Sequence, residues 1–449
     1  MAENNTERNQ LSRRNFLKGG LLAGAGIVLG KCLIDSGAEV PGSLAQETSP
    51  THTVYLPNVR KEPTPTHTPT ATPTVTPTPR PGTGPKVIHV RNSNATNWNG
   101  SGWYGNAVNQ AAVDTMVQHG LQDLTNKSSW AGIWSALFSQ VQPSGYQKGQ
   151  GIAIKVNFNN SGYLNGGCDG TGNYIDALFQ PVKALIAGLV AAGVNQDDIW
   201  IYDATVVGRI IPDRFRTPIL SSYPAVRFYG KGDCTGVNAV SHGGHSSLTV
   251  QFSDPQSHLS DRRLANVLYN ATYLINMPIL KKHGISPATL GFKNHFGSLD
   301  NIIRGGNDSL HDFINPGDDT SPYNSHYSPL VDIYKNPNIK DKTVLSMGDG
   351  LYGASGATAN AAQSWTTFGG DAANSLFFAA DPVAIDCVMT DFIKKEWNWG
   401  MDGAYDYLFC AEETSLGICE GTRSNPGGDP LHTPYGSGYS KIQYARVDL

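Results

Sequence analysis

The sequence predicts an α/β protein: a mostly parallel or mixed sheet with helices on both faces and Gly/Asn-rich loop excursions. Short apolar runs bounded by turn residues alternate with amphipathic helical patterns, which favours parallel strands joined by helical crossovers. The 449 residues include 50 glycines and 27 prolines, and 16% are charged, as is typical of a folded, loop-rich protein. Ligands of such sheets bind beyond the carboxyl ends of the strands. The residues that follow each strand are therefore the first to consider for function.

The first half of the predicted sheet is a β-α-β succession. The expected elements are a strand at 86–91, helices at 106–124 and 128–141, a strand at 151–157, a helix at 176–193 and a strand at 199–203. The helix at 176–193 has the clearest pattern, and it ends on Gly193, a residue favoured just beyond the last helical turn. This succession predicts that Lys155, Asn157 and Asp203 lie at strand ends.

The second half adds strands and one long helix. Further strands are expected at 225–229, 247–252, 273–277, 343–347 and 376–379, and a helix at 382–397. Asp381 is expected to cap that helix, because an aspartate side chain accepts hydrogen bonds from the first free N–H groups. Pro382 suits the first helical position, where no N–H is needed.

The N-terminus has the form of an export signal. Arg13 and Arg14 are paired in Ser12-Arg13-Arg14-Asn15-Phe16-Leu17-Lys18, before an apolar run at 19–30 that is shorter than the about 20 residues of a spanning helix. Residues 1–45 are therefore predicted to be a twin-arginine signal peptide, cleaved after Ala45, with the twin-arginine translocase as partner. The mature protein is expected in the periplasm, secreted or at the cell surface, with membrane contact only through the signal segment.

Residues 46–85 are predicted to be a linker. Proline and threonine dominate the stretch from Glu62 to Pro85, and this composition cannot bury a core and favours extended polyproline II backbone. The remaining residues, 86–449, are predicted to form the α/β domain, in one or two lobes.

Charge and cysteine content exclude some functions. The 33 basic and 37 acidic residues give a net charge of −4 without a basic stripe, so no nucleic-acid partner is expected. Cleavage would leave the five cysteines Cys168, Cys234, Cys387, Cys410 and Cys419. Cys410 and Cys419 are close enough in sequence to form a small disulfide loop outside the cytoplasm, and Cys387 is expected to be buried. The spacing excludes an iron–sulfur cluster.

Histidines concentrate in the middle of the chain. Seven of the 12 are His242, His245, His258, His283, His295, His311 and His326. The segment 280–297 follows a predicted buried strand, and basic and imidazole groups there can hold a carboxylate, a phosphate or a metal. We predict Lys293, His283 and His295 as catalytic residues, with His283 and His295 also as candidate ligands of a metal centre. The predicted substrate-binding residues are Lys155, Asn157, Lys281, Asn294 and Asp203.

If these residues converge, like charges should disfavour protonation of Lys293 and lower its pKa. A neutral lysine amine can act as a nucleophile or covalent tether. A structural interpretation remains open: His283 and His295 satisfy backbone carbonyls, and Lys293 forms an ion pair. The pair His242 and His245 is a weak metal candidate without a third ligand.

Three aspartates also have structural interpretations. Asp381 and Asp386 suit a helix cap and an inward-facing polar group better than acid–base catalysts, and Asp349 is either a turn residue or a ligand. The chain has no G-x-x-x-x-G-K-[ST], H-E-x-x-H or G-x-S-x-G motif, so the usual marks of P-loop, zincin and α/β-hydrolase enzymes are absent.

The segment after the predicted strand resembles the signature of the bacterial and archaeal family known as domain of unknown function 362. The matching residues are Pro278, Leu280, Lys281, His283, Gly284, Thr289, Lys293, Asn294 and Gly297. Two further stretches are similar to family motifs: 154–157, where Val156 replaces the usual proline, and 380–386. The resemblance covers about 150–400. Many relatives carry ferredoxin-like cysteine clusters, which imply electron transfer, and this chain lacks them.

A single motif is also similar to nickel-pincer lactate racemases, in which a lysine ten residues after a histidine bears the cofactor. His283 and Lys293 have that spacing, with Gly291 nearby. This likeness implies racemisation or epimerisation of an α-hydroxy acid by hydride transfer through a tethered nickel cofactor, with Lys293 as the tether.

The sequence thus predicts an exported α/β protein with a Lys/His site for a small anionic ligand or a metal cofactor, with isomerase or redox-type chemistry. The alternative is a non-catalytic, surface-tethered binding or interaction protein.

Overall fold

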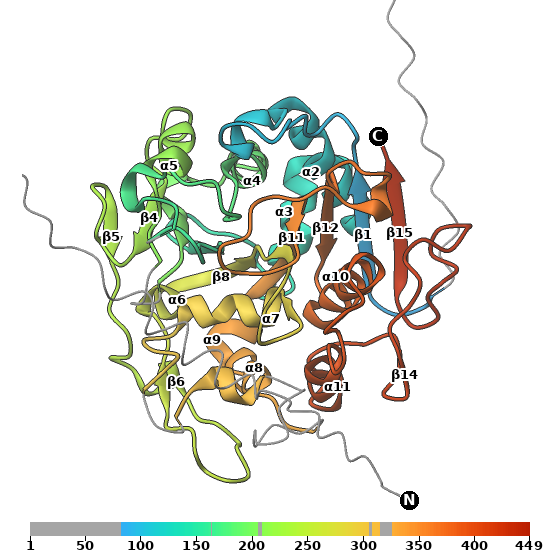
Figure 1. Cartoon of the computed structure of the whole chain (residues 1–449). Coiled ribbons are helices and arrows are strands. Elements are labelled where there is room, and N and C mark those ends of the chain that lie inside the picture. The colour runs from blue at the N-terminus through green and yellow to red at the C-terminus, as the bar shows by residue number, and fades with distance from the viewer. Residues whose placement is uncertain (1–81, 163, 205–208, 305–307, 315–325) are drawn as a thin grey trace, which may run out of the picture. The chain divides into compact units, whose positions relative to one another are not determined.

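Eleven strands form one mixed sheet in the computed structural model, which describes residues 82–449 apart from 163, 205–208, 305–307 and 315–325. The strands are β1 (Lys86–Arg91), β2 (Gly151–Lys155), β3 (Ile199–Tyr202), β4 (Arg227–Gly230), β5 (Val237–Ala239), β8 (Ala271–Asn276), β9 (Ile279–Lys282), β10 (Ala288–Thr289), β11 (Thr343–Ala354), β12 (Ser375–Ala379) and β15 (Gln443–Asp448). Their order is β15-β1-β12-β11-β8-β2-β3-β4-β5, with β9 beside β11 and β10 beside β9 (Figure 1). The predicted signal peptide and most of the predicted linker lie outside the described residues.

Most neighbouring strands are parallel. β2 pairs in parallel with β3 and β8, β8 with β11, and β1 with β15. β12 is antiparallel to both of its neighbours, β1 and β11. The carboxyl ends of β1, β2, β3, β8 and β11 therefore meet at one edge of the sheet. The predicted α/β class is confirmed.

Helices cover both faces of the sheet, as predicted (Figure 1). One face carries α2 (Gln110–Thr125), α3 (Trp130–Phe138), α4 (Phe179–Ala191) and α5 (Asp213–Leu220), and the other carries α6 (Asn266–Asn270), α7 (Gly291–Asn294), α8 (Pro329–Tyr334), α9 (Pro337–Lys340), α10 (Pro382–Glu396) and α11 (Asp406–Glu413). Alternate residues of β2 enter the two hydrophobic cores: Ile152 and Ile154 pack with α2–α5, and Ala153 packs with the opposite layer. No helix of the described residues is long and apolar enough to cross a membrane.

Local sequence explains the helix ends. The Asp381 side chain accepts hydrogen bonds from the N–H groups of Val383 and Ala384 at 2.8 and 2.9 Å, so it caps α10 as predicted. The Asn109 side chain accepts from Ala112 N–H and caps α2. Beyond α4, Gly193 has a φ of 94°, a left-handed conformation that glycine adopts without a steric penalty.

Two strand predictions differ from the structure. The strand expected at 247–252 shrinks to β6 (Thr249–Val250), which pairs with β7 (Arg262–Arg263) outside the main sheet, because Ser253 N–H donates to the Asp332 carboxylate and the chain leaves the strand. The strand expected at 343–347 instead runs to Ala354 as β11, so Asp349 lies within a strand and is not a turn residue.

The cysteine pairing also differs from the expectation. The disulfide joins Cys168 to Cys234, which are 66 residues apart. Cys410 and Cys419 form no disulfide, because Cys419 Sγ lies 3.4 Å from Cys387 Sγ, whereas Cys410 Sγ lies 4.0 Å from the Arg423 guanidinium. Cys387 is buried, as predicted.

Candidate functional site

A hairpin carries the histidine-rich segment beyond the end of β8. Pro278 has no N–H to continue the ladder of β8, but its carbonyl accepts from Asp349 N–H at 2.8 Å, and β9 then runs beside β11. β9 turns back into β10, with Lys282 opposite Ala288. Residues 283–287 are therefore the hairpin loop, and α7 begins directly after β10.

The start of α7 is anchored by a side chain from α10. Asp386 accepts hydrogen bonds from Gly291 N–H at 2.8 Å and Phe292 N–H at 3.1 Å. A Cβ at position 291 would lie 2.9 Å from Asp386 Oδ1 and 3.1 Å from Asn276 Nδ2, so the contact requires glycine. Burial raises the pKa of Asp386 to about 7. The inward-facing role expected of Asp386 is thus to hold α7 against α10.

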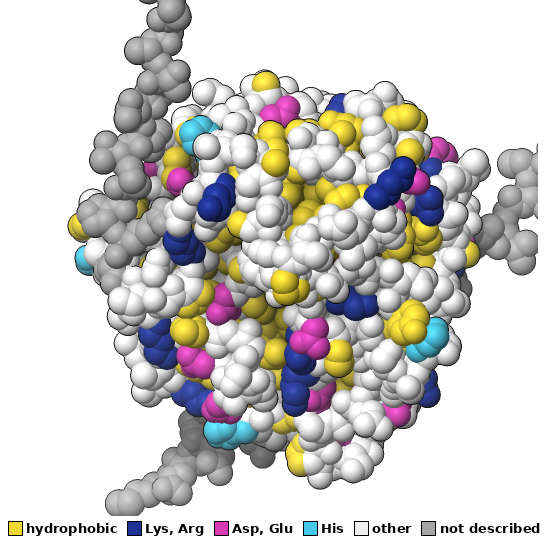
Figure 2. All heavy atoms as spheres, turned by 180° about the vertical axis from the view of Figure 1, so that it is seen from behind, with side chains coloured by type: hydrophobic (Ala, Val, Ile, Leu, Met, Phe, Trp, Pro, Cys, Tyr) yellow, Lys and Arg dark blue, Asp and Glu magenta, His cyan; other side chains and the backbone are white. Residues whose placement is uncertain are grey.

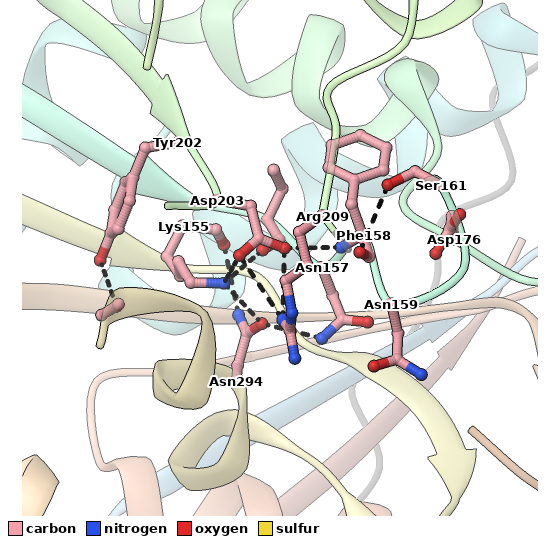
Figure 3. A network of polar contacts seen from close by, with 12 residues as sticks. Lys155, Asn157, Phe158, Asn159, Ser161, Asp176, Tyr202, Asp203, Arg209 and Asn294 are labelled. Atoms are coloured by element: carbon pink, nitrogen blue, oxygen red, sulfur yellow. Dashed lines mark hydrogen bonds and ion pairs between the residues drawn. The ribbon is translucent and has the colours of Figure 1, made fainter. Parts of the chain in front are cut away.

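Behind α7, four buried polar residues form what we call the closed network: Lys155, Asn157, Asp203 and Asn294 (Figure 3). Lys155 Nζ lies 3.1 Å from Asp203 Oδ1 and donates to Asn294 Oδ1 at 3.1 Å and to the Val156 carbonyl at 2.6 Å. Asn157 Nδ2 also donates to Asn294 Oδ1, at 3.1 Å. All three N–H bonds of the Lys155 ammonium are therefore matched by acceptors.

The carboxylate of the closed network is equally well satisfied. Asp203 Oδ2 accepts from Phe158 N–H at 2.7 Å and lies 3.3 Å from Arg209 Nη1. Burial lowers the pKa of Lys155 to about 8, while Asp203 opposes that shift. A Cβ at Gly297 would lie 2.6 Å from Lys155 Nζ, so glycine is required for α7 and the following turn to pack on this network.

In front of the closed network lie five basic or imidazole side chains that we call the cationic group: Lys281, Lys293, Arg209, His283 and His311. Lys293 is 6% exposed, and its Nζ lies 4.2 Å from the centre of the Phe296 ring. Within the described residues Lys293 has no carboxylate or hydrogen-bond partner, and the charges that act on it are those of Arg209 and Lys281. Lys281 Nζ donates to Asn157 Oδ1 at 2.9 Å, which links the two sets of residues.

The pKa values of Lys281, Lys293, His283 and His311 are shifted against the charged form. Burial, followed by repulsion from Arg209 and Lys281, holds the pKa of Lys293 well below its usual value. Burial and the nearby Lys293 lower the pKa of His283 in the same way, and burial lowers the pKa of His311 to about 3. The pKa of Lys293 is therefore lowered, as predicted, but burial contributes more to this shift than the neighbouring positive charges do.

The hairpin loop orients the ring of His283. Its Nδ1 accepts hydrogen bonds from the N–H groups of Ile285 and Ser286, both at 3.0 Å. The ring thus binds backbone N–H groups, not the carbonyls of the structural interpretation. In the neutral ring the proton must then be on Nε2, which makes Nε2 a donor. The ring stacks on His311, with centroids 5.8 Å apart and planes 11° apart.

His295 has different surroundings. It is fully buried, with Nδ1 3.2 Å from Ser298 Oγ and its ring edge-on to Tyr334 at 5.5 Å. Burial and then Lys155 lower the pKa of His295 to about 3. Its position is that of a packed core residue between the closed network and α8.

Geometry gives no support to a metal centre in the described residues. No group of three or more His, Cys, Asp or Glu side chains in that part of the chain could hold a metal ion. In the weaker candidate pair, His242 and His245, the His245 ring stacks on Tyr269 with centroids 3.6 Å apart, and His242 Nε2 has no hydrogen-bond partner among the described residues.

Sequence reasoning missed three residues of the site. Arg209 lies 3.3 Å from Asp203 Oδ2 through its Nη1, and its only sequence signal is that it comes soon after a strand end. His311 was one of the clustered histidines, but nothing in its spacing pairs it with His283. Asp176 interacts electrostatically with Lys281, and its carboxylate accepts a hydrogen bond from Asn165 Nδ2 at 2.7 Å. Burial raises the pKa of Asp176, which is labelled in Figure 3, to about 6.

Comparisons with known proteins give two matches to family models. A model described as "Domain of unknown function (DUF362)" matches residues 152–391, more than half of the chain, and a twin-arginine translocation pathway signal model matches residues 10–30. A search of curated proteins found no match. The first range contains the closed network and the cationic group. The likeness to nickel-pincer racemases is not supported by these matches and rests on one spacing, that of His283 and Lys293.

Proposed function

The chain belongs to the DUF362 family and carries a twin-arginine signal that directs its export across the cytoplasmic membrane, and we propose that its cationic group binds a small carboxylate ligand. The single observation that carries the proposal is Lys293, a buried lysine with cations around it and no acidic partner among the described residues.

Such an arrangement is unfavourable without a ligand. An ammonium group that loses its hydration without gaining a counter-charge costs several kcal/mol, or else gives up its proton. A bound carboxylate would supply the missing negative charge. Arg209 offers a planar set of donors for it, and His283 offers Nε2–H.

The lowered pKa also gives Lys293 a chemical role in this proposal. A neutral amine can accept a proton or attack a carbonyl carbon, and this property fits an enzyme in which Lys293 and His283 are the catalytic residues. We propose that Lys155, Asn157, Asp203 and Asn294 position the site without touching the ligand, because their polar atoms bind one another. His295 would be a packing residue of the same kind.

Calorimetric titration with oxalate, pyruvate and L-lactate tests the proposal. The wild-type protein should bind at least one of these carboxylates, and Lys293→Met should weaken binding at least tenfold, about 1.4 kcal/mol. The matched control is Lys335→Met, because Lys335 is exposed and lies 3.9 Å from Asp332 on α8. Equal affinity in wild type and Lys293→Met, or no binding by the wild type, would contradict the proposal.

We also propose that the mature protein is a tethered domain, with residues 46–85 as the spacer and 86–449 as the folded body. Gly84 N–H donates to the Lys441 carbonyl at 3.0 Å, so the body holds the chain from about this residue onward. Limited proteolysis should release a stable fragment that begins near Gly84–Lys86, and a protease-resistant spacer would contradict this division.

A further inference from the structure

A polar cavity lies at the same edge of the sheet as the cationic group, beyond the ends of β1 and β11. Its volume is about 570 Å³, which falls in the roughly 300–1,000 Å³ range of small-molecule sites. The lining residues that matter here are Ser93, Asn97, Trp98, Gln363, Asp371 and Asn374. They come from the loop after β1 and from the chain between β11 and β12, and none of them belongs to the cationic group or the closed network.

The chemistry of this cavity is unlike that of the cationic group. Its described lining consists of hydroxyl and amide side chains, one carboxylate, glycine, alanine and two aromatic rings, and it includes no Lys, Arg or His. A cavity without a cation gives no counter-charge to an anion. Groups that both donate and accept hydrogen bonds suit a neutral ligand with many hydroxyl groups.

Trp98 supplies a fixed apolar surface within this polar setting. Its Nε1–H donates to the Ser101 and Gly102 carbonyls at 2.9 and 3.3 Å. The ring is edge-on to Tyr104 and Tyr352, with centroids 6.2 and 6.3 Å away. The indole nitrogen and the ring orientation are thus fixed by the protein itself, so the ring can offer a flat surface without further ordering.

The polar side chains are also held in place. Asn374 is buried, and its Oδ1 accepts from Thr96 Oγ1 at 2.6 Å, which leaves the N–H groups of the amide for a ligand. Gln363 Oε1 accepts from Ser355 N–H at 2.5 Å, which leaves its amide nitrogen in the same way. Asp371 is exposed and adds an acceptor. The cavity therefore combines oriented donors, an acceptor and an aromatic ring.

We propose that this cavity binds a neutral oligosaccharide. A pyranose ring has an apolar face of C–H groups that packs on an aromatic ring, and an edge of hydroxyl groups that each donate and accept hydrogen bonds. Trp98 matches the face, and Asn97, Asn374 and Asp371 match the edge. The inference does not depend on the function proposed for Lys293, because the two sites share no residue.

Binding is tested by calorimetric titration of the full chain with maltotriose, cellotriose, xylotriose and chitotriose. At least one of these should bind with a Kd below about 10 mM, and Trp98→Ala should weaken that binding at least tenfold. Trp399→Ala is the matched control, because Trp399 is 65% exposed and outside the cavity. Lys293→Met should bind the sugar like the wild type.

A second variant guards against misfolding. If circular dichroism shows that Trp98→Ala is unfolded, the double variant Asn97→Ala/Asp371→Ala replaces two exposed lining residues and should weaken binding about fivefold. The proposal is overturned if no sugar of the panel binds the wild-type protein, or if a folded cavity variant binds as tightly as the wild type.

Discussion

Lys155 and Lys293 are both buried at the carboxyl edge of the sheet, yet they lie in opposite electrostatic surroundings. Lys155 has Asp203 at 3.1 Å and two further acceptors, and the pKa of its ammonium is about 8 despite full burial. Lys293 has Phe296 beneath it and cations nearby, and burial together with those cations holds its pKa well below its usual value. The closed network is complete without a ligand, whereas the cationic group is not.

Residue type alone therefore does not separate structural from functional lysines. Both lie within the residues that match the DUF362 family model. A buried cation whose N–H groups all have acceptors stabilises the contact between the elements that supply them. A buried cation without an acidic partner is a candidate for ligand binding. On the face shown in Figure 2, by contrast, basic and acidic side chains lie interspersed, as on an ordinary solvated surface.

The largest expected effect comes from breaking the closed network. Asp203→Ala would leave Lys155 and Arg209 buried without their counter-charge, and we expect the free energy of unfolding to fall by about 3–5 kcal/mol. Chemical denaturation with urea measures this loss.

Its matched control is Asp197→Ala. Asp197 is 54% exposed and lies 3.6 Å from the exposed Arg227, and such surface pairs contribute about 0–1 kcal/mol. A loss at Asp203 no larger than the loss at Asp197 would mean that the closed network does not brace the fold.

A smaller effect is expected from overpacking the same network. In Gly297→Ala the added Cβ would lie 2.6 Å from Lys155 Nζ and 2.8 Å from Arg209 Nη1, so the free energy of unfolding should fall by about 1–3 kcal/mol. Gly284→Ala is the control, because nothing lies within 4 Å of a Cβ at that position of the hairpin loop. If thermal or urea unfolding shows similar stability for both variants, α7 does not pack tightly on the network.

The affinity of the cationic group for a carboxylate should depend on pH. A bound oxalate favours the ammonium form of Lys293, whose pKa in the free protein is lowered by burial, Arg209 and Lys281. Above that pKa, binding must take up a proton, so the affinity for oxalate should fall as pH rises from 6 to 9, by at most about tenfold per pH unit. Titrations in two buffers of different ionisation enthalpy measure the proton uptake. A wild-type affinity that is constant over this range would count against Lys293 as the binding group.

Much of the fold follows from local pattern, and the site does so only in part. The strand β3, the helix α4 and the capped helix α10 were predictable, because apolar periodicity and an Asp-Pro start are local signals. The continuation of β11 past Met347 was not, because Gly348 and Gly350 look like turn residues. In the structure a Cβ at Gly348 would lie 2.7 Å from Met389 Cε, so close packing of α10 explains that glycine.

The site residues that were missed depend on long-range contacts. Lys293, His283 and Lys155 could be found from motifs. The contact of Arg209 with Asp203 and the stacking of His311 on His283 involve residues whose surrounding sequence carries no periodic signal. The same holds for Cys168 and Cys234, whose 66-residue separation no spacing rule reveals. The sequence also does not show which buried lysine has acceptors for its N–H groups and which has none, because this depends on the residues that surround each Nζ in the fold.

The distinction between the closed network and the cationic group is tested by comparing the unfolding free energies of Lys155→Met and Lys293→Met at pH 7, measured by urea denaturation of the full chain. Lys155→Met should lose about 3 kcal/mol or more, because it leaves the Asp203 carboxylate buried beside a methyl group. Lys293→Met should lie within about 1 kcal/mol of the wild type or be more stable, because it removes a buried amine that has no acidic partner among the described residues. A loss at Lys293 as large as that at Lys155 would show that both lysines are structural, and it would contradict the distinction between the closed network and the cationic group.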